Sequence, residues 1–335
     1  MNVSSLEKLK KAGNMDTDAA ANENRRKGRI GGLDTLRGLA LIAMASYHFT
    51  WNLEYFGYLE PGTATTGLWK LYARGIASSF LFLAGFSLFL AHGKGVNWPS
   101  FGKRFAMVAG SALLITVATY FAFPDSFIFF GILHNIAAAS LVGLLFLRAP
   151  AVVTLLFAVI AFILPQYLQS ELFNAKWLAW IGFSTMPPRS NDYVPLLPWL
   201  APFLSGLAVS QFVTPRDWLD RFRSPSSPRN LIASAGRHSL AFYLIHQPVL
   251  IGLVYTLSLI APPPPVDQVE LYKSSCEKSC VEQANGLELC QRFCGCTLEK
   301  LQAENLFDMM MEGKLSADQQ TKVSEVAQQC TAEAQ

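Results

Sequence analysis

Ionisable side chains inside apolar stretches are the residues of this chain that could do chemistry. Such groups are costly within a membrane and usually serve a function. A histidine at such a place is suited to proton transfer, because a neutral imidazole titrates near neutral pH and can act as a general base. It would take a proton from a hydroxyl or amine that attacks an acyl carbonyl. The ionisable residues in apolar stretches are Asp34, Arg37, His48, Glu54, Arg74, His134 and His246.

The positions of the three histidines predict that they cluster near the middle of the membrane. His48 follows Arg37 by eleven residues, which is roughly 16 Å along a helix. His134 and His246 each lie seven residues into a stretch, roughly 10 Å deep, and the two stretches enter from opposite sides. Each histidine could instead only hydrogen-bond across helices, and Asp34 could be only an N-cap with Arg37 as its partner.

The elements that must position these groups are membrane helices. Of the 335 residues, 51% are hydrophobic and only 15% are charged, whereas a soluble domain carries about a quarter charged residues. A membrane helix needs about 20 mostly apolar residues. We therefore predict an all-α polytopic membrane protein with about seven transmembrane helices. The seven stretches are 33–56, 68–91, 105–123, 127–147, 151–168, 194–212 and 239–261, and the apolar segment 172–183 is too short to span.

The distribution of lysine and arginine predicts the orientation. Residues 1–30 form a polar, basic leader with no apolar core, so we interpret them as disordered and cytoplasmic rather than as a secretory signal. Alternate loops after that are basic, whereas the others are poor in basic residues, and basic loops face the cytoplasm. Seven spans then place the C-terminus outside. The basic loop residues are Lys94, Lys103, Arg104, Arg148, Arg216, Arg221, Arg223 and Arg229.

The segment 262–335 is predicted to be a proline spacer followed by a small disulfide-stapled helical domain. All six cysteines lie in it, which indicates an oxidising compartment. Two pairs have a spacing of four, which puts both sulfurs on one face of a helix. Two antiparallel helices would then be stapled as Cys276–Cys294 and Cys280–Cys290, leaving Cys296 for Cys330, one of 15 possible connectivities.

Other interpretations of this tail remain open. The cysteines could bind a metal, or Cys294 and Cys296 could form a redox-active pair. A domain for stability or docking is the plainer interpretation. Residues Ser316 to Gln319 match a capping box that would begin a last helix leading to Cys330. In the membrane body the histidines lack a metal-ligand spacing, so we expect no metal there.

Five ordered segments between residues 30 and 260 resemble a known family of enzymes. The first resembles the opening of transmembrane acyltransferases, with ten residues between Arg37 and His48 as in acyltransferase-three proteins. Together they resemble bacterial relatives of the catalytic domain of heparan-α-glucosaminide N-acetyltransferase. The segments are LDTLRGLA at 33–40 with YHF at 47–49, FLFLAGFS at 80–87, FGILHNIA at 130–137, DYVPLLPW at 192–199 and SLAFYLIHQP at 239–248.

This resemblance implies transfer of an acetyl group from cytoplasmic acetyl-CoA to an acceptor sugar across the bacterial inner membrane. The histidine of the animal enzyme lies just after the first helix, but no histidine lies between Trp51 and Leu90 here. We therefore expect His48 to be the general base. His134 or His246 would be a second base or an oxyanion stabiliser.

The resemblance also implies binding residues on the two faces of the membrane. Basic side chains at the cytoplasmic face would hold the phosphates of CoA, and aromatic rings outside would stack on a sugar. The plain alternatives are that basic loops only set topology and that Trp199 only shapes a helix entry. The donor-side candidates are Arg37, Lys94, Lys103 and Arg104; the substrate candidates are Asp34, Glu54, Arg74, Asn135, Asp192, Tyr193, Trp199 and Gln247.

Rival functions use the same residues differently. A transporter or proton-coupled channel would use the intramembrane histidines and Glu54 as a relay. A membrane anchor would display the cysteine domain to a periplasmic partner, and a thiol-disulfide relay would need cysteines that the membrane body lacks. The expected partners are the bilayer and a saccharide acceptor, with a homo-oligomer or a tail partner possible. The net charge of +3 is too small to indicate nucleic acid.

Overall fold

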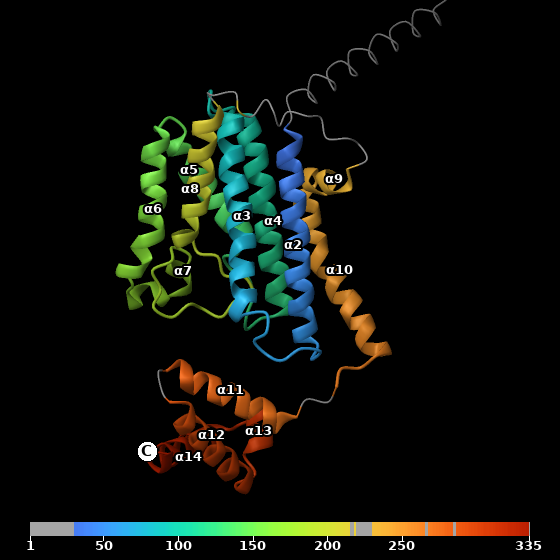
Figure 1. Cartoon of the computed structure of the whole chain (residues 1–335), viewed down its shortest axis with the longest axis vertical. Coiled ribbons are helices and arrows are strands. Elements are labelled where there is room, and N and C mark those ends of the chain that lie inside the picture. The colour runs from blue at the N-terminus through green and yellow to red at the C-terminus, as the bar shows by residue number, and fades with distance from the viewer. Residues whose placement is uncertain (1–29, 215–217, 219–229, 265–266, 284–285, 335) are drawn as a thin grey trace, which may run out of the picture. The chain divides into compact units, whose positions relative to one another are not determined.

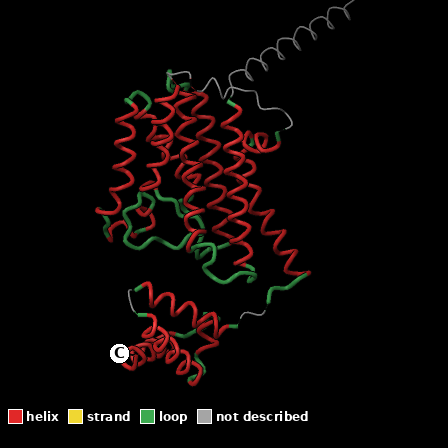
Figure 2. Tube along the Cα trace, viewed as in Figure 1, coloured by secondary structure: helices red, strands yellow, loops and turns green. Residues whose placement is uncertain are grey.

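The structure is a computed structural model that describes residues 30–214, 218, 230–264, 267–283 and 286–334. The basic leader and the loop arginines Arg216, Arg221, Arg223 and Arg229 lie outside the described residues. The described residues form helices and no strand (Figure 2). They divide into two compact units, one containing Thr65–Leu253 with the described residues before Trp51, and one containing Trp51–Ala64 with the residues from Val254 on.

A helix lies at each of the seven predicted stretches, as Figure 1 shows. Among the described residues, four helices are long and apolar enough to cross a membrane: α3, α4, α8 and α10. Helices α5 and α6 are apolar but shorter, at 15 and 17 residues. The all-α membrane fold is thus confirmed. The bounds are α2 (Gly31–Tyr55), α3 (Gly67–His92), α4 (Trp98–Ala122), α5 (Ile132–Phe146), α6 (Ala151–Tyr167), α8 (Leu196–Val213) and α10 (Ser239–Ile260).

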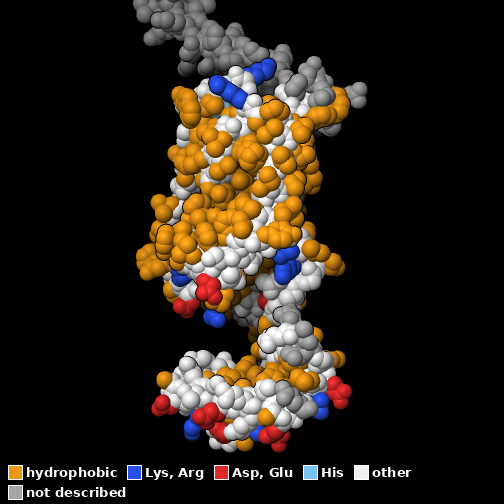
Figure 3. All heavy atoms as spheres, turned by 90° about the vertical axis from the view of Figure 1, so that its left-hand side faces the viewer, with side chains coloured by type: hydrophobic (Ala, Val, Ile, Leu, Met, Phe, Trp, Pro, Cys, Tyr) orange, Lys and Arg blue, Asp and Glu red, His pale blue; other side chains and the backbone are white. Residues whose placement is uncertain are grey.

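The surface of the helical bundle has the polarity of a membrane protein. In Figure 3, hydrophobic side chains cover the middle of one face, and charged side chains gather toward its ends. Large apolar side chains point outward, including Phe121, Leu145 and Val152, each 79% exposed. Exposing so many large apolar side chains to water would be unfavourable, whereas lipid tails in a membrane would solvate them.

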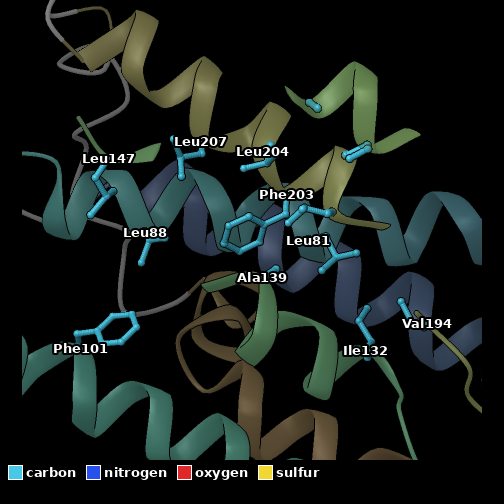
Figure 4. Close-up of a cluster of buried hydrophobic side chains, with 14 residues drawn as sticks. Leu81, Leu88, Phe101, Ile132, Ala139, Leu147, Val194, Phe203, Leu204 and Leu207 are labelled. Carbon is cyan, nitrogen blue, oxygen red and sulfur yellow. The ribbon is translucent and has the colours of Figure 1, made fainter. Parts of the chain in front are cut away.

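Helices α3 and α8 form the centre of the bundle because glycines let their backbones approach. A Cβ at Gly85 would collide with the carbonyl oxygen of Phe203, and one at Gly206 would collide with that of Phe82. Small residues serve this purpose in membrane helices, where close packing replaces the hydrophobic effect. Around this contact, Figure 4 shows the buried cluster that includes Leu81, Phe203, Leu204 and Leu207.

Short elements complete the first unit. The apolar segment 172–183 forms the 3-10 turn η1 (Glu171–Asn174) and the single turn α7 (Lys176–Ala179), so it does not span. Helix α9 (Leu231–Arg237) begins at Asn230, whose side chain accepts a hydrogen bond from the backbone N–H of Ala233. It ends where α10 starts.

The second unit contains a small helical domain held by three disulfides. They pair Cys276 with Cys294, Cys280 with Cys290 and Cys296 with Cys330, the arrangement that the spacing favours. The capping box also forms, since Ser316 N–H donates to Gln319 Oε1 and Gln319 N–H donates to Ser316 Oγ. The helices are α11 (Gln268–Glu282), α12 (Leu287–Ala303), α13 (Phe307–Met311) and α14 (Ala317–Ala334).

Candidate active site

Two of the three membrane histidines lie against each other in the first unit. His48 comes from α2 and His246 from α10, and their ring centroids are 5.0 Å apart with the planes tilted by 54°. His246 is 8% exposed and His48 is partly buried. Because neither helix is near the other in the sequence, this pair exists only through the packing of the bundle.

The hydrogen bonding of His246 leaves one ring nitrogen available. Its Nδ1 lies 2.6 Å from the carbonyl oxygen of Tyr243, and a carbonyl can only accept, so Nδ1 carries the hydrogen. In the neutral ring, Nε2 then carries a lone pair. This Nε2 is buried and has no hydrogen-bond partner among the described residues. A fixed tautomer with a free basic nitrogen is the arrangement that a general base requires.

His134 is held differently, because both of its ring nitrogens are bonded. The N–H of Gly131 donates to its Nδ1 at 3.2 Å, so its Nε2 carries the hydrogen and donates to Thr116 Oγ1 at 3.1 Å. The hydroxyl of Thr116 in turn donates to the carbonyl of Ile128. These bonds close the start of α5 and join it to α4, as a capping side chain does.

A basic cavity of about 460 Å³ lies in the first unit. Three arginines, Arg37, Arg104 and Arg237, line it together with His238, and most of the remaining lining is apolar. Lys94 and Lys103, expected on the donor side, are exposed and do not line this cavity. Sequence reasoning missed Arg237 and His238, although they stand directly before the segment 239–248.

The guanidinium of Arg37 is held in a defined orientation. Its Nη1 pairs with Asp34 Oδ1 at 3.0 Å, and its Nη2 donates to Ser87 Oγ at 2.5 Å. Asp34 is 1% exposed, so this ion pair is largely buried. The backbones of α2 and α9 also touch, since a Cβ at Gly236 would collide with the carbonyl oxygen of Asp34. Arg37 is therefore preorganised before any ligand binds.

The cavity reaches the start of α5 and a residue that contacts the histidine pair, although neither histidine lines it. Tyr243 lines the cavity and holds His246 through its carbonyl. Ile132 also lines it, and its N–H donates to Asp192 Oδ2 at 3.0 Å. Burial raises the pKa of Asp192 to about 6, although the bond from Ile132 acts in the opposite direction. A Cβ at Gly131 would collide with the Asp192 carboxylate, so a larger residue there would displace this carboxylate.

The other expected acceptor residues mainly hold the segment 192–199 in place. The hydroxyl of Tyr193 donates to the carbonyl of Ala179 at 2.6 Å, and burial raises its pKa to about 12. The amide of the fully buried Asn135 donates to the carbonyls of Val194 and Pro195. Trp199 packs against the core cluster, and Gln247 follows His246 and is partly buried.

Two further candidates lie apart from the cavity. Both carboxylate oxygens of Glu54 accept backbone N–H bonds, from Gly62 at 2.6 Å and from Ala64 at 2.7 Å, so this side chain closes the loop after α2. Arg74 is exposed on α3. In the tail, Cys296, Cys330 and Glu333 lie close enough to hold a metal, but both sulfurs are joined in a disulfide.

Together the fold and site define a helical membrane protein with a basic cavity and, next to Tyr243 of its lining, a pair of histidines. The family model described as heparan-alpha-glucosaminide N-acetyltransferase, catalytic, matches residues 29–248, and the chain belongs to this family. It is thus a member of a family of membrane acetyltransferases, as the sequence segments predicted. Comparison with curated proteins and with solved structures finds no match.

Proposed function

We propose that this chain moves an acetyl or other acyl group from cytoplasmic acyl-CoA to an amine or hydroxyl of an envelope saccharide. One observation carries the proposal: Tyr243 lines the basic cavity and also fixes the tautomer of His246. A donor held by the arginines would thereby lie beside a histidine pair with a free basic nitrogen. The bacterial inner membrane, with the N-terminus inside, is the proposed location.

The residues of the cavity fit an acyl-CoA as donor substrate. Its phosphates are anionic, and guanidinium groups bind phosphate with two parallel hydrogen bonds. The apolar lining suits the pantetheine arm, and the volume falls in the range of about 300 to 1,000 Å³ for small-molecule sites. We assign phosphate binding to Arg37, Arg104 and Arg237. Lys94 and Lys103 would add a weaker, screened attraction at the surface.

The chemistry follows from the histidine pair. His246 Nε2, or His48 beside it, takes the proton of the acceptor amine or hydroxyl as its nitrogen or oxygen bonds to the acyl carbon. The carbon–sulfur bond of the thioester then breaks, and the thiolate leaves with the proton that the histidine returns. His134 would contribute by fixing the start of α5, where Asp192 lies.

The acceptor would approach from the side of the segment 192–199. Asp192 is the proposed acceptor-binding group in this segment. One oxygen of its carboxyl accepts a hydrogen bond from the N–H of Ile132 at the start of α5, and the other can accept a hydrogen bond from a sugar hydroxyl. Tyr193 and Trp199 place aromatic rings in the same segment. Asp34 acts in this scheme by orienting Arg37 rather than by touching the acceptor.

Donor binding is the first experiment. Purified full-length protein in detergent is titrated with acetyl-CoA, with free CoA and with a nucleotide that lacks the pantetheine arm. We expect saturable binding of acetyl-CoA that Arg104→Gln or Arg237→Gln weakens at least tenfold, whereas Arg148→Gln, an exposed loop arginine, leaves it unchanged. Equal affinity in all four proteins, each shown to be folded, would overturn the assignment of the cavity.

The transporter interpretation is separated by a second readout. In proteoliposomes the proposed enzyme consumes acetyl-CoA and releases CoA only when acceptor saccharide is supplied. A transporter would instead move substrate without consuming the thioester. Flux without CoA release would therefore contradict the proposal.

A further inference from the structure

Helix α3 carries a basic face near its start that the cavity does not include. Lys70 and Arg74 are four residues apart, so their side chains share one face of the helix, and both are exposed. Within the described part of the chain, neither side chain makes an ion pair or a hydrogen bond. Like charges at this spacing repel each other by a few tenths of a kcal/mol, so an anion between them would stabilise both.

The surroundings of this face place it among lipid headgroups. Helix α3 is apolar enough to span a membrane. Counted from Gly67, Lys70 is about 5 Å and Arg74 about 10 Å along the axis, a depth from which long basic side chains reach the interface. Trp69 and Tyr72, the ring types that favour the interface, lie in the same turn region.

We propose that Lys70 and Arg74 bind the phosphate of an anionic lipid headgroup. Leu71, 61% exposed and three residues before Arg74, would contact its acyl chain. A Cβ at Gly67 or Gly75 would meet no atom within 4 Å, so no neighbouring element crowds the helix at these two positions. A zwitterionic headgroup brings its own cation, whereas an anionic one leaves its charge for these side chains. The charge of the face therefore selects an anionic lipid.

Native mass spectrometry of the full chain released from detergent micelles tests this site, because it counts retained lipids and protein copies together. The probes are phosphatidylglycerol and phosphatidylcholine at equal concentration. We expect wild type to retain at least fivefold more phosphatidylglycerol, and Lys70→Gln with Arg74→Gln to remove this preference. The charge-preserving pair Lys70→Arg with Arg74→Lys should keep it.

The matched control is Lys94→Gln with Arg148→Gln, which removes the same charge from two exposed residues elsewhere. Retention of the preference in this control supports a specific site. An equal loss in both double variants would instead show unspecific attraction and overturn the proposal. A variant that keeps its lipids but changes the ratio of monomer to dimer would also overturn it, because a second copy would then cover this face. None of these readouts depends on acyl transfer.

Discussion

The imidazole rings of His48 and His246 lie with their centroids 5.0 Å apart, although they come from the first and the last helix of the bundle. Two imidazolium ions at this distance in a membrane interior would repel strongly, so the pair holds at most one added proton. One proton is what acyl transfer to an amine or hydroxyl requires the enzyme to accept and return. This capacity fits the single proton that the proposed reaction would exchange with the enzyme.

Replacing His246 tests its role directly. His246→Gln removes the basic Nε2, and we expect CoA release with acceptor to fall by about 10² to 10⁴-fold while acetyl-CoA binding persists. The control is His134→Ala, which loses the bonds that begin α5. It should lower the free energy of unfolding by about 1 kcal/mol and leave the turnover of folded enzyme within a few-fold of wild type. A large loss of turnover in His134→Ala with little loss in His246→Gln would instead identify His134 as the base.

Ser87 should act on donor affinity through Arg37. Ser87→Ala removes the hydroxyl that accepts from Arg37 Nη2, so the guanidinium loses a contact that fixes its orientation. We expect KM for acetyl-CoA to rise several-fold with little change in kcat. Ser46→Ala serves as the control, because its exposed hydroxyl bonds Tyr72 instead. A fall in kcat with an unchanged KM would show that Arg37 does not hold the donor.

Asp192 should make stability depend on pH in an unusual direction. Its pKa is raised from 3.8 to about 6 in the folded protein, so folding favours the protonated form. The contribution of Asp192 to the free energy of unfolding is therefore fully present below pH 3.8, and it is lost as the pH rises to about 6. Asp192→Asn, which keeps an oxygen for the Ile132 N–H, should abolish the dependence. Thermal unfolding of both proteins between pH 4 and pH 7 measures it, and parallel curves would contradict the raised pKa.

The bond between Cys296 and Cys330 should stabilise the tail domain. It closes a loop with a sequence separation of 34, for which chain entropy predicts a loss of about 3 to 4 kcal/mol on removal. Changing both cysteines to serine should lower the unfolding temperature of the tail. Ser316→Ala, which removes only a helix cap, should cost about 1 kcal/mol. An equal effect of the two changes would mean that the disulfide adds no constraint.

Much of this protein could be predicted by counting along the chain. Apolar length and the spacing of Cys276, Cys280, Cys290 and Cys294 depend only on local geometry, since rise per residue and helix periodicity are constants. The helices and the disulfide pairing followed from them. The family was also readable, because its segments are continuous in sequence.

How the histidine rings are placed relative to one another was decided by the tertiary structure. Depth along a helix places His48, His134 and His246 at similar levels, but it does not say how each helix is rotated. Packing turned the His246 ring toward His48 and left its Nε2 without a hydrogen-bond partner among the described residues. Both ring nitrogens of His134 are instead hydrogen-bonded, to Gly131 and to Thr116. The contact of His246 with His48 and the bond of His134 to Thr116 both join different helices, so no local pattern could assign them.

The basic cavity likewise combines features that the sequence predicts with features that only the tertiary structure decides. The sequence by itself determined that arginines stand at helix ends and that apolar stretches cross a membrane. Only the tertiary structure decided that Arg104 and Arg237 line one cavity with Arg37, while Lys94 and Lys103 do not. The physical reason is that a cavity is enclosed by several helices at once, and their contacts depend on side-chain packing between residues far apart in the chain.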